Sequence, residues 1–136
     1  MNISENIKKI HEEVTTWRHE LHANPELCYE ENWTAEFITE KLKSFGIEVH
    51  NKIGKTGVIG VLKGSNSKEH KSNRSIGLRA DMDALPIEEE NDFDYKSKFL
   101  GKMHACGHDG HVAMLLGAAK ILSKEKKFSG TVYFIF

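Results

Sequence analysis

The chain has 136 residues, which is the size of a single domain and enough to bury a hydrophobic core. Its formal net charge is −1 and 29% of its residues are charged, so no basic surface argues for nucleic-acid binding. The N-terminus is polar and no apolar run approaches the length that spans a membrane, so we expect a soluble cytoplasmic protein without a membrane partner.

The first two predicted elements are amphipathic helices. Apolar residues recur at three- and four-residue steps from Ile3 to Leu21, which predicts a helix with Ser4 near its start. This helix ends before Asn24-Pro25, and a second helix is predicted roughly from Asn32 to Phe45, with Gly46 as its stop. We interpret the apolar residues of both helices as core.

Three short strands are predicted next. Ile47 to Val49 and Gly57 to Leu62 have strand patterns, and Gly54 to Gly57 is the turn between them. Gly64 to Arg74 is a polar loop without an apolar anchor, so it is a poor place to look for function. Ser75 to Asp81 follows as the third strand.

Two carboxylates, Asp81 and Asp83, come at the carboxyl end of the third predicted strand. Ligands bind at that end of the strands in open α/β sheets, and the spacing puts both side chains on one side if the strand continues. The functional interpretation is a metal ligand, or a carboxylate that orients a ligating histidine. A solvated turn before Pro86 is an equally open interpretation, because Asp is common in turns.

The stretch from Ala84 to Gly101 has no regular pattern and contains the acidic run Glu88-Glu89-Glu90. This run could suggest catalytic carboxylates. We interpret it instead as a solvated acidic loop, because runs of like charge usually face solvent.

A dense group of ligand-type side chains lies in residues 104–111. It contains His104, Cys106, His108, Asp109 and His111, with glycines at 107 and 110 that let the backbone turn. Cys and His suit zinc, a carboxylate suits manganese, and a core does not accept so many polar groups.

Two other uses of this cysteine must be weighed. A zinc finger would need a second ligand pair, and Cys28, the only other cysteine, lies in a different segment, so a disulfide framework is not indicated either. A nucleophilic Cys106 with a histidine base stays open as an alternative. The nearby aspartates favour a bound cation over an activated thiolate.

The chain ends with a predicted helix over 111–123 and a strand over 131–136. The helix is apolar on nearly all sides, so it should be buried, and the strand has the pattern of a central parallel strand covered on both faces. Together with strand 75–81 they form a plausible βαβ unit, which places both strand ends at one edge of the sheet. A residue just beyond Phe136 would then lie beside the loop of Cys106 and His108.

These motifs resemble a known family. Residues 79–86 (RADMDALP) and 103–111 (MHACGHDGH) resemble the metal-dependent amidohydrolases and peptidases that include hippurate hydrolases, N-acyl-L-amino-acid amidohydrolases and auxin-conjugate hydrolases. Residues 17–27 are similar to the N-terminal signature of this family, and residues 130–136 resemble the strand that leads into its paired-glutamate motif. The resemblance covers essentially the whole chain.

The resemblance implies a fold and a domain organisation. The expected fold is α/β: three α/β/α layers with a mixed, largely parallel sheet, as the first part of a zinc-peptidase-like catalytic domain. Residues 1–136 would be the N-terminal part of the catalytic metallo-hydrolase domain, about the first third of a family member, with the lid or dimerisation domain absent.

The resemblance also implies roles for individual residues. Cys106 and His108 match the first two ligands of a site for two divalent metal ions, Mn²⁺ or Zn²⁺, and Asp83 matches an acidic residue that supports this site. Asp81, Asp109 and His111 are candidates for further support. The general base is implied to be a glutamate just after strand 131–136, and it and the later ligands are absent from these residues. We therefore expect the isolated chain to be inactive.

The implied function is hydrolysis of the amide bond of an N-acyl amino acid, or of a similar small or peptide-like substrate, by metal-activated water. One alternative is a non-catalytic chain that binds metal weakly or pairs with another chain. A Cys-dependent hydrolase that uses Cys106 is a less favoured alternative. The apolar faces of segments 111–123 and 131–136 predict self-association, so a homo-oligomer is among the expected assemblies.

Overall fold

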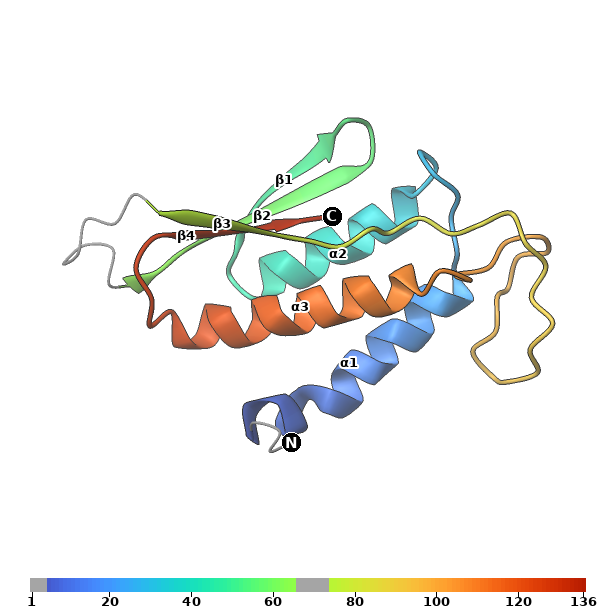
Figure 1. The fold of residues 1–136 in the computed structure, drawn as a ribbon, viewed down its shortest axis with the longest axis horizontal. Helices are drawn as coiled ribbons and strands as arrows, with labels where there is room; N and C mark the ends of the chain where they lie inside the picture. The colour runs from blue at the N-terminus through green and yellow to red at the C-terminus, as the bar shows by residue number, and fades with distance from the viewer. Residues whose placement is uncertain (1–4, 66–73) are drawn as a thin grey trace.

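The computed structural model describes residues 5–65 and 74–136 (Figure 1). The elements in chain order are α1 (Glu5–Ala23), α2 (Asn32–Ser44), β1 (Glu48–Ile53), β2 (Gly57–Lys63), β3 (Ser75–Arg79), α3 (His108–Glu125) and β4 (Thr131–Ile135). Every predicted helix and strand is present, although α3 begins earlier than predicted, at His108. The predicted helix start at Ile3 and Ser4, and positions 66–73 of the polar loop, lie outside the described residues.

The strands form one mixed sheet in the order β1-β2-β4-β3. β1 and β2 are antiparallel, β2 and β4 are antiparallel, and β3 and β4 are parallel. In Figure 1 the three helices lie on the same side of this sheet, with α2 against β1 and β2 and with α1 packed against α3. The predicted α/β class with a mixed sheet is confirmed.

The helices form where the sequence places apolar side chains on one face. Trp17 and Leu21 of α1 are buried, as are Val112 and Leu116 of α3, so the two helices share a core. Their close approach depends on Gly117, since a Cβ atom there would lie 3.1 Å from Cγ2 of Val14.

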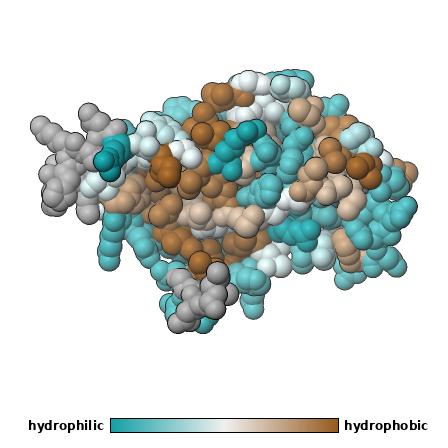
Figure 2. All heavy atoms as spheres, viewed as in Figure 1, coloured by the Kyte–Doolittle hydropathy of each residue, from teal (hydrophilic) through white to brown (hydrophobic). Residues whose placement is uncertain are grey.

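An apolar groove of about 820 Å³ remains on the outer side of α1 and α3, lined by residues such as Ile10 and Met114. In Figure 2 apolar side chains gather over these two helices. Met114 is 63% exposed, so α3 is less completely buried than its composition predicts. None of the described helices combines the length and hydropathy needed to cross a bilayer.

The prediction that strand 131–136 is covered on both faces is wrong for the described residues. Val132 and Phe134 of β4 are buried against the helices, whereas Tyr133 between them is 38% exposed. The physical reason is that the described helices cover only one face of the sheet, so the apolar residues on the other face stay accessible.

The predicted βαβ arrangement of β3, α3 and β4 is confirmed. Arg79 pairs with Ile135 in the parallel register, and the Ala80 amide continues the ladder by donating to the Ile135 carbonyl at 3.0 Å. The carboxyl ends of β3 and β4 therefore lie side by side. The segment that carries Asp83 leaves the sheet beside Phe136.

The alternation along β4 predicts unequal effects of two truncations. Phe134→Ala removes a fully buried ring and should lower the free energy of unfolding by about 3–5 kcal/mol. Tyr133→Ala, the matched control on the other face, should lower the free energy of unfolding clearly less. Urea denaturation of both variants measures this difference. Equal losses would contradict the assignment of the two faces of β4.

Candidate functional site

The loop before α3 is held against the segment that follows β3. The Leu85 amide donates to the Met103 carbonyl at 2.9 Å, and the Met103 amide donates to the Leu85 carbonyl at 3.0 Å. A turn follows, in which Gly107 adopts φ +77° and donates its amide to the His104 carbonyl at 3.2 Å. Glycine suits this left-handed position, and the turn places exposed Cys106 directly before α3.

The structure brings together two of the predicted site residues, Asp83 and His108. Nδ1 of His108 donates to Oδ1 of Asp83 at 2.9 Å and lies 3.0 Å from the Asp83 carbonyl oxygen. With its proton on Nδ1, the imidazole presents the lone pair of Nε2 on its other side. A carboxylate behind a histidine in this way is the usual arrangement for a metal-ligating ring.

The donor set of this loop fits a divalent cation. A free thiol at Cys106 and an imidazole at His108, backed by Asp83, are ligand types that suit zinc, and a carboxylate also suits manganese. Among residues 5–65 and 74–136, however, no three His, Cys, Asp or Glu side chains converge in a group that could hold a metal. The described residues therefore offer a pair of candidate ligands, whereas catalytic zinc sites normally use three.

Two further candidates are placed less centrally. The ring of His111 stacks on that of His108 with centroids 5.4 Å apart, but His111 is exposed. Asp81 pairs with Arg79 at 2.5 Å on the surface, and not with a histidine, within the described part of the chain. A supporting role for these two residues stays a prediction.

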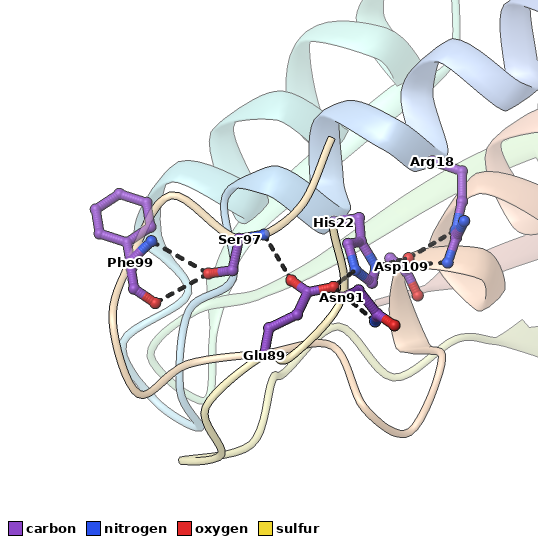
Figure 3. Close-up of polar contacts among 7 residues, drawn as sticks. All are labelled: Arg18, His22, Glu89, Asn91, Ser97, Phe99 and Asp109. Atoms are coloured by element: carbon purple, nitrogen blue, oxygen red, sulfur yellow. Dashed lines mark hydrogen bonds and ion pairs between the residues drawn. The ribbon is translucent and has the colours of Figure 1, made fainter. Parts of the chain in front are cut away.

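Asp109, the last of the predicted supporting residues, is the centre of a buried polar network (Figure 3). Its side chain is 1% exposed, and its Oδ2 accepts hydrogen bonds from Nε of Arg18 at 2.8 Å and from Nδ1 of His22 at 2.7 Å. Arg18 and His22 both come from α1, one helical turn apart. The network therefore joins α1 to the first turn of α3.

Glu89 extends this network, and the prediction that its acidic run is solvated is wrong at this residue. Its side chain is 3% exposed, and Oε1 accepts a hydrogen bond from Nε2 of His22 at 3.0 Å. Asn91 and the Ser97 amide also donate to it, at 3.0 and 2.6 Å. Burial raises the pKa of Glu89, but the hydrogen bonds from Asn91, His22 and Ser97 together hold its pKa below the usual value. The flanking Glu88 and Glu90 are exposed, as predicted.

Sequence reasoning missed Arg18, His22 and Glu89 as members of this site. A signal was present on α1, because Arg18 and His22 each follow a buried apolar residue, Trp17 and Leu21, and so lie at the edge of the buried face. No comparable signal marks Glu89, because its partner His22 comes from a helix far away in the sequence.

His104 is the most unusual histidine of the group. It is 4% exposed, and neither ring nitrogen has a partner among the described residues; Oδ1 of Asp109 is likewise buried without one. Burial of the ring lowers the pKa of His104 to about 4, against the opposing effect of the Asp109 charge and with a further contribution from His22. His104 is therefore neutral near pH 7.

The comparisons with known proteins point to one family. Residues 77–136 match the Peptidase family M20/M25/M40. A hippurate hydrolase from Campylobacter jejuni is 49% identical over 136 residues, which cover 100% of this chain and 34% of that protein. An N-acyl-L-amino acid amidohydrolase from Geobacillus stearothermophilus is 48% identical over 137 residues, which cover 97% of this chain and 36% of that protein.

A solved structure supports the same assignment. A Bacillus subtilis protein described as a dinuclear metal-binding peptidase from the M20 family superposes with a TM-score of 0.86 at 40% identity, over 95% of this chain and 35% of that one. The fold and motifs are thus similar to those of amidohydrolases and peptidases. The chain belongs to the Peptidase family M20/M25/M40, and it spans about a third of the length of the relatives it matches.

The low pKa of His104 predicts a pH-dependent stability. Its pKa is about 4 in the folded chain against a usual value of 6.5, so as the pH falls from about 6.5 the unfolded chain binds a proton that the folded chain does not. The free energy of unfolding should therefore fall, by up to about 1.4 kcal/mol per pH unit from this residue, until the pH nears the folded pKa.

Urea denaturation of the wild type and of His104→Gln, at a series of values between about pH 7 and pH 5, measures this contribution. The variant should show a shallower pH dependence, because glutamine does not titrate. Identical pH slopes in the two proteins would contradict a depressed pKa at His104.

Proposed function

We propose that residues 1–136 form the N-terminal part of the catalytic domain of a metal-dependent amidohydrolase. The substrate class that we propose is N-acyl amino acids or similar small amides, cleaved at the amide bond. The observation that carries the proposal is the contact of Asp83 with Nδ1 of His108, which prepares the other ring nitrogen for a metal ion. The names of the two curated relatives support the substrate class.

We assign the following roles to the residues of the site. Cys106 as a thiolate and His108 through Nε2 would hold a divalent ion, Zn²⁺ or Mn²⁺, and Asp83 would keep the imidazole in the required tautomer and orientation. Bound divalent ions would polarise the scissile carbonyl and lower the pKa of a bound water. Gly107 contributes the backbone turn that separates the two ligands.

The remaining machinery is proposed to meet this loop at the edge of the sheet. The parallel pairing of β3 and β4 puts the end of β4 beside the segment that carries Asp83. From the family resemblance we propose that the general base follows that strand, so that it would approach Cys106 and His108 from the position following Phe136. Glu89 is a poor candidate for the base, because both of its carboxylate oxygens already accept hydrogen bonds.

A metal-binding measurement tests the assignment of the ligands. Because two protein ligands do not make a tight site, residues 1–136 should bind Zn²⁺ or Co²⁺ with a dissociation constant above about 1 μM. Cys106→Ala combined with His108→Ala should abolish this binding in calorimetric titrations. Cys28→Ala removes the other free, exposed thiol and serves as the matched control, with no expected change. Tight binding that survives the double substitution would refute the assignment.

A second test concerns catalysis by residues 1–136 alone. We expect no measurable hydrolysis of N-benzoylglycine or N-acetyl amino acids, with or without Mn²⁺ or Zn²⁺. The reason is that proton transfer by a general base contributes about 10²–10⁴-fold in rate, and the proposed base is not among these residues. Release of the free amino acid measures the reaction. Metal-dependent turnover that His108→Ala abolishes would show that the described residues already contain a complete site.

A further inference from the structure

The buried network around Asp109 contains none of the proposed metal ligands, yet it is attached directly beside one of them. Asp109 follows His108 in the first turn of α3, and the two side chains that bond it, Arg18 and His22, come from α1. Glu89, from the loop between β3 and α3, bonds His22 in turn. We propose that Arg18, His22 and Glu89 are positioning residues that fix the Cys106–His108 loop by acting through Asp109. This inference rests on the metal-binding function proposed for that loop.

The network combines two acidic and two basic side chains. Asp109 and Glu89 are carboxylates with side chains 1% and 3% exposed, and Arg18 and His22 lie between and beside them. Nδ1 of His22 lies 2.7 Å from Oδ2 of Asp109 and its Nε2 lies 3.0 Å from Oε1 of Glu89, so this one ring bridges the two carboxylates. Removing His22 would therefore take one partner from each of two buried carboxylates, which lowers the free energy of unfolding.

Aromatic rings shield this network from water. The ring of Phe93 lies 5.7 Å from that of His22, the ring of Tyr95 meets it edge-on at 5.8 Å, and Phe93 and Tyr95 stack on each other. The guanidinium of Arg18 lies over the Tyr95 ring at 5.5 Å. Electrostatic contacts are stronger where water is excluded, which applies to His22, Asp109 and Glu89 more than to Arg18, whose side chain is 36% exposed.

The network meets the loop at the turn that leads into α3. The turn is held by three backbone hydrogen bonds, donated by the amides of Gly107, Gly110 and His111 to carbonyls at 104 and 107. Asp109 lies among these donors, and its negative charge also suits the amino end of a helix. Midway along the helix pair, α1 contacts α3 through Val14 and Gly117. Anchoring Asp109 to α1 thus fixes the position of the first turn of α3, and with it the position of His108.

Replacing a buried ion-pair group with well-packed apolar residues is often neutral or stabilising, so stability alone is a weak reason for such a group. If the network served only stability, removing one partner would lower the melting temperature and leave the loop unchanged. A positioning network predicts a change in the loop itself. The two roles can be separated in the 136-residue chain.

The first measurement is Co²⁺ affinity in His22→Gln and in His19→Gln. His19 is the matched control, because it lies on the same helix and stacks on Tyr95 with centroids 3.6 Å apart, while the recorded contacts of Asp109 are with Arg18 and His22. His22→Gln should weaken Co²⁺ binding about tenfold, at the low end of what partners behind metal ligands contribute, because it acts one residue further away. His19→Gln should bind like the wild type.

The second measurement needs no metal. Hydrogen exchange should become faster at the amides of Gly107, Gly110 and His111 in His22→Gln, while amides of β2 and α2 keep their protection. If wild-type binding of Co²⁺ does not depend on Cys106 and His108, the proposed function fails, and this exchange pattern alone decides the positioning role. Unchanged loop exchange with unchanged affinity overturns the inference, as does a uniform loss of protection over the whole chain.

Glu89→Gln provides a milder variant if His22→Gln does not fold. It keeps the shape of the side chain and the acceptor for Nε2 of His22 but removes one charge from the network. Glu89→Gln should weaken Co²⁺ binding a few-fold and should also make hydrogen exchange of the loop amides faster. A folded Glu89→Gln chain with wild-type affinity and wild-type loop exchange would overturn the proposal.

Discussion

The parallel pairing of β3 with β4 is the constraint on which the site depends. Adjacent parallel strands cannot be joined by a tight turn, so the chain must leave the sheet, cross one face and return. In this protein the crossover runs from Ala80 to Gly130, and it contains the irregular segment, the turn at Gly107 and the helix α3. The candidate ligands lie where the crossover turns into α3, and Asp83 lies where it leaves β3. A topological requirement of the sheet thus brings Asp83 to His108.

The crossover is tied down by electrostatics as well as by packing. Its long irregular segment has few buried apolar residues, but Glu89 enters the interior and meets His22, and the first turn of α3 meets Arg18 through Asp109. These contacts make α1 a fixed support for two parts of the crossover. Apolar contacts such as Gly117 against Val14 hold the same helices together further along.

Some features were predictable because their causes are local. Gly46 stops α2 and adopts φ +72°, and the apolar period of α1 places Trp17 and Leu21 in the core, so both helices can be recognised from nearby residues. The candidate ligands could equally be predicted from the sequence, because Cys106 and His108 lie in one short motif. The failures share a different cause. Glu89 was misassigned because its partner is His22, and Tyr133 because its exposure depends on which faces of the sheet other elements cover.

The sequence by itself determined the order and type of the elements, the ligand-type residues and the family, since period, turn chemistry and motifs are properties of neighbouring residues. Only the tertiary structure decided that Asp83 contacts His108, that Asp81 turns to Arg79 instead, and that Asp109 and Glu89 are buried. The environment of a carboxylate depends on tertiary packing and not on its neighbours in the sequence. Whether it meets water, a cation or an imidazole is settled when α1, the crossover and the sheet pack together.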